Sequence, residues 1–338
     1  MIVGICSIIW LRRICCLVCL LGPATALAEP FTIVALPDTQ NYAQAFPVQF
    51  SAQTQWIVDN RTAQNIVFVT QEGDIVQNGA LGASQNQAEW NVADSAFGIL
   101  DAGSPNLPYG VVLGNHDLDN PNNRSAATRY VDFFGASRYA DSPWYGGSSS
   151  DERNHYQRFM AGGRTFLNIS LEWRPLGSSL SWAHSVLDAN PTHPTIITTH
   201  EYSGIGGRNL PGQTIFNSLV KENSQVFMVL SGHVLGEGQQ TATNTAGQPV
   251  FELLANYQGR ANGGDGWMRL IEFDEANSQI NVKTFSPTRD QFETDASSQF
   301  SLTVDFDERF GPAVPEPSTF ALAALGLLSL FIYSYRAT

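Results

Sequence analysis

Short runs of apolar and β-branched residues recur along the chain, and each run ends in a cluster of polar residues. Runs of this length and composition are typical of strands that are buried on both faces of a sheet. They cover residues 31–36, 66–70, 110–113, 165–171, 195–199, 226–230, 250–255, 268–273, 280–285 and 300–304. The pattern therefore predicts a core built on β-sheet.

Between the early runs, apolar residues follow a helical period. Trp90, Ala93, Phe97 and Leu100 share one helix face, and a second helix is predicted around residues 180–187. Strands and helices alternate in the first two-thirds of the chain, and strands dominate the last third. We therefore expect one α/β (α+β) domain with a mixed sheet core and helices outside it.

Two further features of the sequence concern a predicted loop and nucleotide-binding motifs. The glycine- and serine-rich stretch 146–150 is predicted to be a surface loop. The chain contains neither G-x-G-x-x-G nor G-x-x-x-x-G-K-[ST], so the sequence does not indicate nucleotide binding by those loops.

The first 28 residues have the pattern of a secretory signal peptide. An arginine pair, Arg12 and Arg13, precedes the apolar stretch 14–21, and small residues end at Ala28, where we expect cleavage. An uncleaved anchor is the alternative. All four cysteines lie in this segment, so the mature chain would have no thiol, and any metal would be held by oxygen and nitrogen.

The other end carries Val-Pro-Glu-Pro at 314–317, an apolar run at 320–333 and then Arg336. This arrangement resembles the PEP-CTERM sorting tail of exported bacterial proteins. The resemblance implies transient membrane insertion of the C-terminal helix and cleavage by an exosortase-type enzyme. It also implies a location at the cell surface or in the extracellular matrix of a Gram-negative-type bacterium, with a membrane anchor before cleavage. A plain C-terminal anchor or a buried last helix is the alternative.

These ends divide the chain into a signal peptide (1–28), a central domain (29–310) and a sorting segment (311–338). The whole chain has 18 basic and 31 acidic residues and a net charge of −13. Three of the basic residues lie in the terminal segments, so residues 29–317 keep 15 basic and 31 acidic residues, a net charge of −16. Such a chain offers no nucleic-acid-binding surface, and with only two lysines it has no polybasic run for anionic lipid.

Candidate metal ligands follow the predicted strands. Because strand carboxyl ends that lie on one sheet edge meet in one crevice, we expect these side chains to converge. Carboxylate, amide and imidazole groups suit Mn²⁺, Fe or Zn²⁺. The residues are Asp38, Gln40, Asp74, Asn115, His116, Asp117, His200 and His233.

In this order the blocks resemble the calcineurin-like metallophosphoesterase superfamily, whose pattern is D-x-H, GD-x-x-x-N, GNH[DE], a later His and GHxH. Asp74 with Asn78 and the block 114–117 match it, whereas Gln40 replaces the first histidine and Leu235 the last. The resemblance implies a four-layer αββα sandwich with two mixed sheets. It also implies a secreted metal-dependent phosphoesterase in which metal-bound hydroxide attacks a small phosphomonoester or phosphodiester.

The resemblance further implies a role for each residue. Two divalent ions (Mn, Fe or Zn) would share Asp74, with one ion also held by Asn115, His200 and His233. The other ion would use Asp38, Gln40 and the position of Leu235, which cannot ligate. His116 would protonate the leaving oxygen or stabilise transition-state charge, and Asp117 would orient its ring.

The departure at Leu235 motivates a competing interpretation, a non-catalytic matrix or surface-binding protein with a degraded metal site. Some residues near the crevice stay ambiguous between substrate contact and rim packing. They are Asp119, Glu201, Tyr202, Asn256, Tyr257, Gln258 and Asp265. The remaining histidines, His155, His184 and His193, are predicted to be surface residues.

Overall fold

Two seven-stranded sheets form the centre of the protein in a computed structural model that describes residues 29–80, 86–103, 106–120, 122, 124 and 126–313. Residues 29–313 form one compact unit. The predicted signal peptide and most of the predicted sorting segment lie outside the described residues. None of the helices in the described part of the chain is both long and apolar enough to cross a bilayer.

The first sheet has the order β15-β14-β13-β1-β2-β3, and β16 also pairs with β14. Its strands β1, β2 and β3 are parallel, whereas β13 to β16 pair antiparallel. Ile33 of β1 is in register with Phe68 on one side and with Ile271 on the other. The strands are β1 Phe31–Leu36, β2 Ile66–Gln71, β3 Tyr109–Val111, β13 Met268–Asp274, β14 Gln279–Ser286, β15 Gln291–Glu293 and β16 Gln299–Thr303.

The second sheet has the order β11-β12-β10-β7-β6-β5-β4, with a parallel centre from β12 to β6 and antiparallel strands at both edges. A short hairpin, β8 with β9, stands apart from it. The strands are β4 Tyr145–Ser148, β5 His155–Ala161, β6 Arg164–Leu171, β7 Thr195–Thr199, β8 Ser203–Gly204, β9 Gly207–Arg208, β10 Val226–Ser231, β11 Gly236–Thr243 and β12 Pro249–Asn256.

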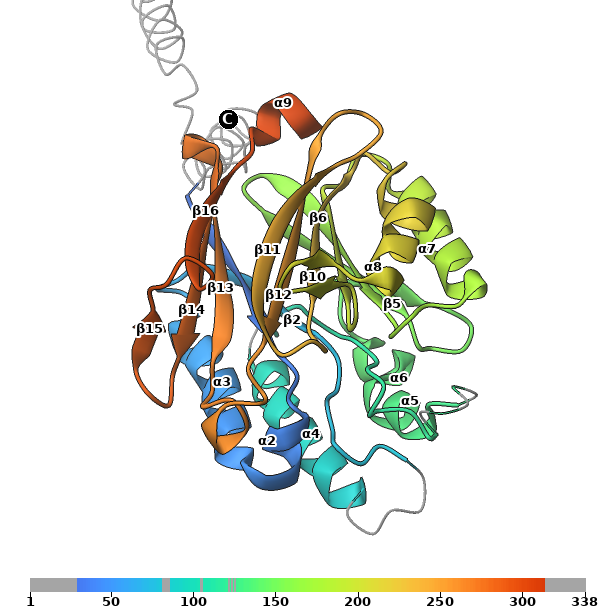
Figure 1. Ribbon diagram of the computed structural model, residues 1–338, viewed down its shortest axis with the longest axis vertical. Helices are drawn as coiled ribbons and strands as arrows, with labels where there is room; N and C mark the ends of the chain where they lie inside the picture. The colour runs from blue at the N-terminus through green and yellow to red at the C-terminus, as the bar shows by residue number, and fades with distance from the viewer. Residues whose placement is uncertain are drawn as a thin grey trace, which may run out of the picture. The chain divides into compact units, whose positions relative to one another are not determined.

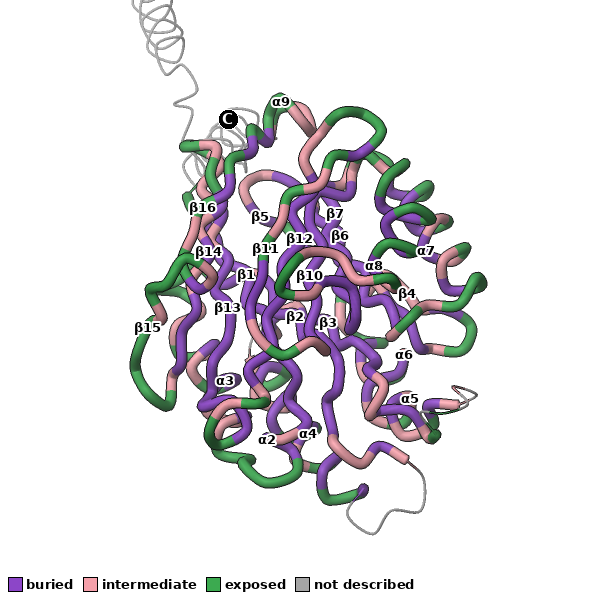
Figure 2. Tube along the Cα trace, in the orientation of Figure 1, coloured by how far each residue is buried: buried purple, intermediate pink, exposed green. Residues whose placement is uncertain are grey.

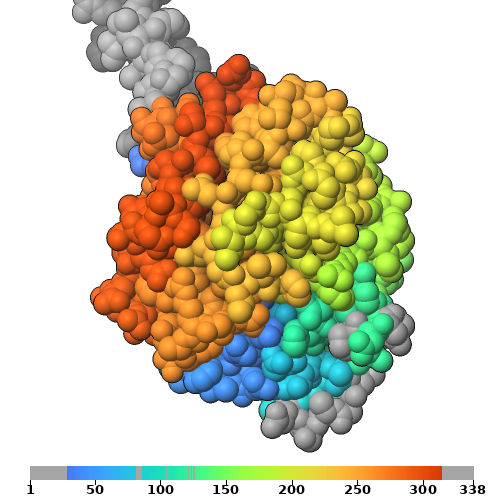
Figure 3. Space-filling view, in the orientation of Figure 1, coloured from blue at the N-terminus to red at the C-terminus, as the bar shows by residue number. Residues whose placement is uncertain are grey.

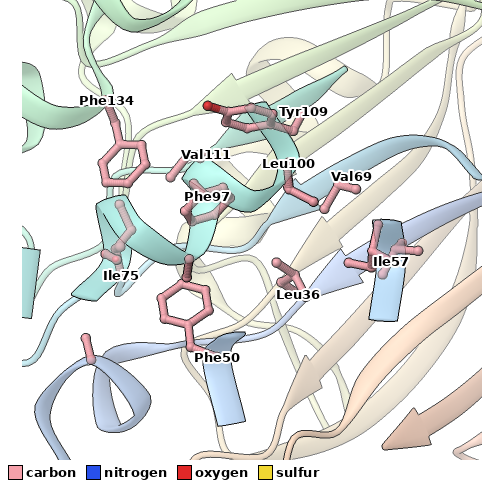
Figure 4. Packing of buried hydrophobic residues seen from close by; sticks show 14 of the residues in the cluster. Leu36, Phe50, Ile57, Val69, Ile75, Phe97, Leu100, Tyr109, Val111 and Phe134 are labelled. Carbon is pink, nitrogen blue, oxygen red and sulfur yellow. The ribbon is translucent and has the colours of Figure 1, made fainter. Parts of the chain in front are cut away.

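The alternation of side chains along β1 separates the layers. Val34 and Leu36 belong to a core shared with the helices α3 and α4, whereas Ile33 and Ala35 belong to a core between the sheets. In the first of these cores, the rings of Phe50 and Phe97 meet edge to face at 5.7 Å (Figure 4). A third core joins the outer face of the second sheet to α7, α8 and η1.

The helices cover the outer faces of the two sheets, as Figure 1 shows for α3 and α4 on one side and α7 and α8 on the other. They are α2 Gln40–Ala45, α3 Pro47–Asn60, α4 Asn86–Asp101, α5 Thr128–Phe134, α6 Ala136–Tyr139, α7 Gly177–Ala189, α8 Leu210–Ile215, η1 Phe216–Val220, η2 Ala261–Gly263, η3 Glu275–Asn277 and α9 Phe306–Phe310. Central strands are buried along their length, while β15 is largely exposed (Figure 2). This arrangement confirms the predicted four-layer αββα sandwich with two mixed sheets.

Two local predictions were wrong. The stretch predicted as a surface loop at 146–150 begins inside strand β4, which pairs with β5. His155, predicted at the surface, lies in β5 with 1% of its surface exposed, beneath the ring of Tyr139. Both errors arise because β4 and β5 are an edge hairpin whose polar and glycine residues do not form an apolar run.

Candidate metal centre

The strand ends of both sheets bring the predicted ligands together. Asp38, Asp74 and Asn115 follow β1, β2 and β3 of the first sheet, whereas His200 and His233 follow β7 and β10 of the second. Parallel strands of each sheet deliver these residues at their carboxyl ends, as expected for an open α/β sheet. The site is therefore built between the sheets.

His200 is the centre of this cluster. Its Nε2 lies 3.1 Å from Asp74 Oδ2, 3.1 Å from Asn115 Oδ1 and 3.1 Å from His233 Nδ1. The ligand atoms of Asp74, His200 and His233 all lie within 4.8 Å of one another. His200 itself is fully buried.

The tautomer of His200 follows from its other nitrogen. Nδ1 lies 2.9 Å from the backbone carbonyl oxygen of Glu72, so Nδ1 carries a hydrogen and donates it. Nε2 then makes at most one hydrogen bond, although three polar atoms lie within its reach. The other two contacts are left without a hydrogen bond to Nε2, and a cation among these atoms would make the arrangement favourable.

Burial and neighbouring charges both shift the pKa values of the ionisable groups in this cluster. Burial disfavours a charge on His200, but the carboxylates of Asp74 and Asp38 outweigh it and raise the pKa of His200 to about 10. Burial raises the pKa of Asp38 well above its usual range, even though His200 lowers it. For Asp74 burial acts in the same direction, but the nearby His200 lowers the pKa below its usual value. A divalent ion would compensate these buried carboxylates.

The backbone approaches the site closely at glycines. A Cβ at Gly114 would lie 2.1 Å from the backbone nitrogen of Asp74, and one at Gly232 would lie 2.0 Å from Asp38 Oδ1. Asp74 and His233 themselves have positive φ angles of 51° and 63°. Such strained conformations in non-glycine residues are often found at functional sites, because the surrounding structure must hold them.

Asp38 and Gln40 lie on the other side of the cluster. Asp38 accepts a hydrogen bond of 2.6 Å from Asn256 Nδ2 and one of 3.2 Å from the backbone N–H of His233. Gln40 donates from Nε2 to Gln77 Oε1 at 2.7 Å, and its own Oε1 is buried without a hydrogen-bond partner in the described part of the chain. Leu235 is 53% exposed and supplies no ligand atom.

His116 and Asp117 differ from their expected arrangement. The His116 ring places Nδ1 2.9 Å from the carbonyl oxygen of Gln77, and its backbone N–H donates to Asp74 Oδ1 at 2.8 Å. Within the described residues, no hydrogen bond joins Asp117 to this ring, contrary to the expected arrangement. Its buried carboxylate instead accepts the backbone N–H groups of Gly114, Ile75 and Val76 at 2.8, 2.8 and 3.1 Å. Asp117 thus fixes the two loops that carry Asp74 and His116.

Two acidic residues that were not predicted as ligands support the site, Glu89 and Glu201, and only Glu201 was expected near the crevice. Glu89 of α4 accepts hydrogen bonds from the backbone of Gln77 and from both the backbone and side chain of Asn78. Glu201 lies 3.7 Å from His233 Nε2, so His233 directs Nδ1 toward the cluster. The only sequence signal for Glu89 was a carboxylate on the first turn of an amphipathic helix.

Arg174 and Trp173 hold Glu201 in place. Both donate to its Oε2 at 2.7 Å, and the arginine also lies over the indole ring at 4.8 Å. Burial raises the pKa of Glu201, but the hydrogen bond from Arg174 outweighs this, and the pKa falls below its usual value. Glu201 therefore carries its charge beside His233.

The remaining ambiguous residues have structural partners. Tyr202 donates to Glu252, and Tyr257 donates to Glu237, with both tyrosines fully buried. Asp119 accepts from Thr128, and Asp265 accepts from Asn262 and Arg289. Asn256 and Gln258 both donate to Asp38, at 2.6 and 3.3 Å.

Comparison with known proteins identifies the same fold. The yellow lupin (Lupinus luteus) seed purple acid phosphatase PPD1 superposes with a TM-score of 0.56 at 12% identity, over 86% of this chain and 57% of that one. A dimetal phosphatase from Danio rerio superposes with a TM-score of 0.52 at 13% identity, over 81% of this chain and 99% of that one. At these identities the likeness concerns the fold.

Sequence comparison is more specific. The uncharacterized protein YvnB of Bacillus subtilis (strain 168) is 34% identical over 294 residues, which are 83% of this chain and 22% of YvnB, so the chain spans about a fifth of that relative. The PEP-CTERM protein-sorting motif matches residues 313–336, as the sequence predicted. The pattern of the calcineurin-like phosphoesterases matches residues 31–237, which include every predicted metal ligand. The chain belongs to the calcineurin-like phosphoesterase family.

Proposed function

We propose that this protein is an exported metal-dependent phosphoesterase that hydrolyses a small phosphomonoester or phosphodiester. One observation carries the proposal. Three polar atoms lie 3.1 Å from His200 Nε2, more than hydrogen bonding can satisfy, and they belong to residues that commonly ligate metals. The family and the fold support the same chemistry.

The residues present fit a divalent ion. Asp74, Asn115, His200 and His233 would hold one ion. Asp38 and Gln40 would hold a second ion, and Asp74 would be a ligand of both ions. A bound divalent ion lowers the pKa of a coordinated water and polarises the phosphoryl oxygens. The buried oxygen of Gln40, which has no hydrogen-bond partner among the residues that the structure describes, supports its place in this set.

The chain's own residues would handle the leaving group. His116 uses Nδ1 to donate to the Gln77 carbonyl, so Nε2 is the nitrogen that can deliver a proton to the leaving oxygen. The His116 backbone N–H binds Asp74, so the same residue also fixes a proposed ligand. Asp117 acts through the backbone of both loops and is a positioning residue.

The cellular setting is part of the proposal. Residues 1–28 would direct export, residues 29–310 would form the catalytic domain, and residues 311–338 would be inserted in the membrane and then cut by an exosortase-type enzyme. The sorting motif at 313–336 supports surface sorting. A non-catalytic surface-binding protein remains the second candidate because Leu235 stands where the family pattern has a histidine.

The deciding experiment loads the purified chain with Mn²⁺, Fe²⁺ or Zn²⁺ and measures metal content by elemental analysis. Hydrolysis of p-nitrophenyl phosphate and bis(p-nitrophenyl) phosphate is measured on the same samples. Asp74→Asn should lose bound ions and turnover while keeping the fold, and Asp132→Asn, on the exposed face of α5, should change neither. One bound ion or none, without turnover on either ester, would reject the phosphoesterase and favour the surface-binding protein with a degraded metal site.

A further inference from the structure

The position that the family pattern fills with its last histidine carries no ligand here. Leu235 is half exposed, and its side chain packs against Gly259, where an added Cβ would lie 3.2 Å from Leu235 Cδ1. The proposed second ion would thus lack one ligand. Gly259 belongs to the segment after β12, so this segment lies beside Leu235, the position without a ligand atom.

Gln258 comes directly before Gly259, and its side chain contacts Asp38. Its Nε2 donates to Asp38 Oδ2 at 3.3 Å, so its amide group lies beside the first carboxylate of the site. Its Oε1 is buried without a hydrogen-bond partner among the described residues. A buried amide oxygen without a partner costs free energy, and a cation beside it removes that cost.

The backbone of Gln258 is fixed on both sides. Its N–H donates to Asn256 Oδ1 at 3.0 Å, and its carbonyl accepts from Asn41 Nδ2 at 3.0 Å. Figure 3 shows the orange segment after β12 lying against the blue segment that carries α2. The side chain is therefore presented to Asp38 from a rigid position.

Gln40 gives a second observation of the same kind. It is 6% exposed, it comes two residues after Asp38, and its Oε1 also has no hydrogen-bond partner within the described ranges. Its Nε2 is used by Gln77, so the oxygen is the atom left over. Among the described residues, two glutamines thus keep a buried amide oxygen without a hydrogen-bond partner, one of them two residues after Asp38 and the other in contact with it.

We propose that Gln258 Oε1 replaces the missing histidine and completes, with Asp38, Gln40 and Asp74, a second ion position made only of oxygen ligands. This inference rests on the proposed function. Oxygen ligands select hard cations such as Mn²⁺ and Mg²⁺, whereas the first position, with two imidazoles, also suits Zn²⁺ and Fe²⁺. The two positions therefore differ in metal preference.

The test titrates the metal-free full chain with Mn²⁺ and follows binding by calorimetry, elemental analysis and electron paramagnetic resonance. Wild-type protein should bind two ions and show the spectrum of a spin-coupled pair. Gln258→Leu should keep one ion with the six-line spectrum of isolated Mn²⁺. Its affinity for the second ion should fall by about 100-fold, because loss of a residue that only hydrogen-bonds a metal ligand already lowers metal affinity by up to about 100-fold.

Two further variants keep this result interpretable. Gln258→Glu retains an oxygen at the same place and should restore two ions, while Gln239→Leu, exposed on β11, should behave as wild type. Circular dichroism of the metal-free proteins checks that all variants fold.

Three results would overturn the inference. They are two ions bound by Gln258→Leu with unchanged affinity, one ion bound by the wild type, and loss of the second ion in Gln258→Glu as well as in Gln258→Leu. A wild type that binds one ion and still hydrolyses esters would reject this inference alone. A wild type that binds none would reject the proposed function too.

Discussion

His116 contacts the backbone carbonyl of Gln77 through Nδ1, and its Nε2 is the nitrogen that we propose as the proton donor. His116→Ala should therefore leave metal content unchanged and should reduce kcat about 100-fold or more for esters with poor leaving groups, because these require a proton. Esters of p-nitrophenol, which leave without a proton, should be affected far less. Equal losses on both substrate types would show that His116 does not act as the acid.

His155 is a histidine with a structural role and a measurable pH effect. Burial lowers its pKa from 6.5 to about 4, and its ring lies between Tyr130 Oη and Gln157 Nε2. Below pH 6.5 the unfolded chain binds a proton that the folded chain does not. The free energy of unfolding should therefore fall as the pH drops from 6.5 to 4, by about 3 kcal/mol in total.

A matched variant isolates this contribution. His155→Gln keeps one donor and one acceptor but cannot titrate, so its urea-unfolding curves at pH 7 and pH 4.5 should differ less than those of the wild type. His184→Gln, on the partly exposed surface of α7, serves as the control. The same pH dependence in wild type and His155→Gln would show that other groups cause the acid destabilisation.

At the scale of the elements, the site depends on loops that are tied to each other. Asp117 follows β3 but binds the backbone of the loop after β2, so one carboxylate fixes both. Asp117→Ala leaves three buried N–H groups without their acceptor and should lower the free energy of unfolding by about 3 kcal/mol. Urea unfolding of the metal-free protein measures this, with exposed Asp132→Ala as control. A loss below 1 kcal/mol would mean that water replaces the carboxylate.

The elements also show what could be predicted from the sequence. Strands such as β1 and β7 were predicted with their observed ends because every residue in them is apolar or β-branched and buried. Strands β5 and β11 were missed because buried and exposed positions alternate along them and polar residues interrupt any apolar run. Edge strands face solvent on one side, so their sequences lack the continuous apolar pattern of a central strand.

Part of the candidate site could also be predicted from the sequence, and part could not. The order of the strand-end blocks predicted which residues lie together, while their roles as ligands stay predictions. The role of Glu89 could not be predicted from the sequence. The contact between Gln258 and Asp38 could not be predicted either, since it joins residues 220 positions apart. Pairing of this kind depends on the sheet order, which a single sequence does not contain.

At the scale of the whole molecule, the charge should influence substrate choice. Residues 29–317 carry a net charge of −16, which repels anions with several charges at low ionic strength. Raising NaCl from 20 to 300 mM screens this repulsion, so kcat/KM should rise several-fold for a substrate with three or more negative charges. It should change little for bis(p-nitrophenyl) phosphate, which has one. A fall in kcat/KM for the multiply charged substrate would indicate a local positive surface at the entrance.

The ligands of the candidate centre come from both sheets, and Asp38 and His233 are 195 positions apart in sequence. An unfolded chain cannot gather them, so an ion enters only after the two sheets have closed on each other. Affinities of nitrogen and oxygen sites follow one general order among the first-row metals, so local supply decides which ion enters first. A chain that folds after export would take its metal from the surrounding medium. The same chain made in the cytosol of a production host would carry that host's ions, so preparations with identical sequence would differ in metal content until the metal is stripped and replaced.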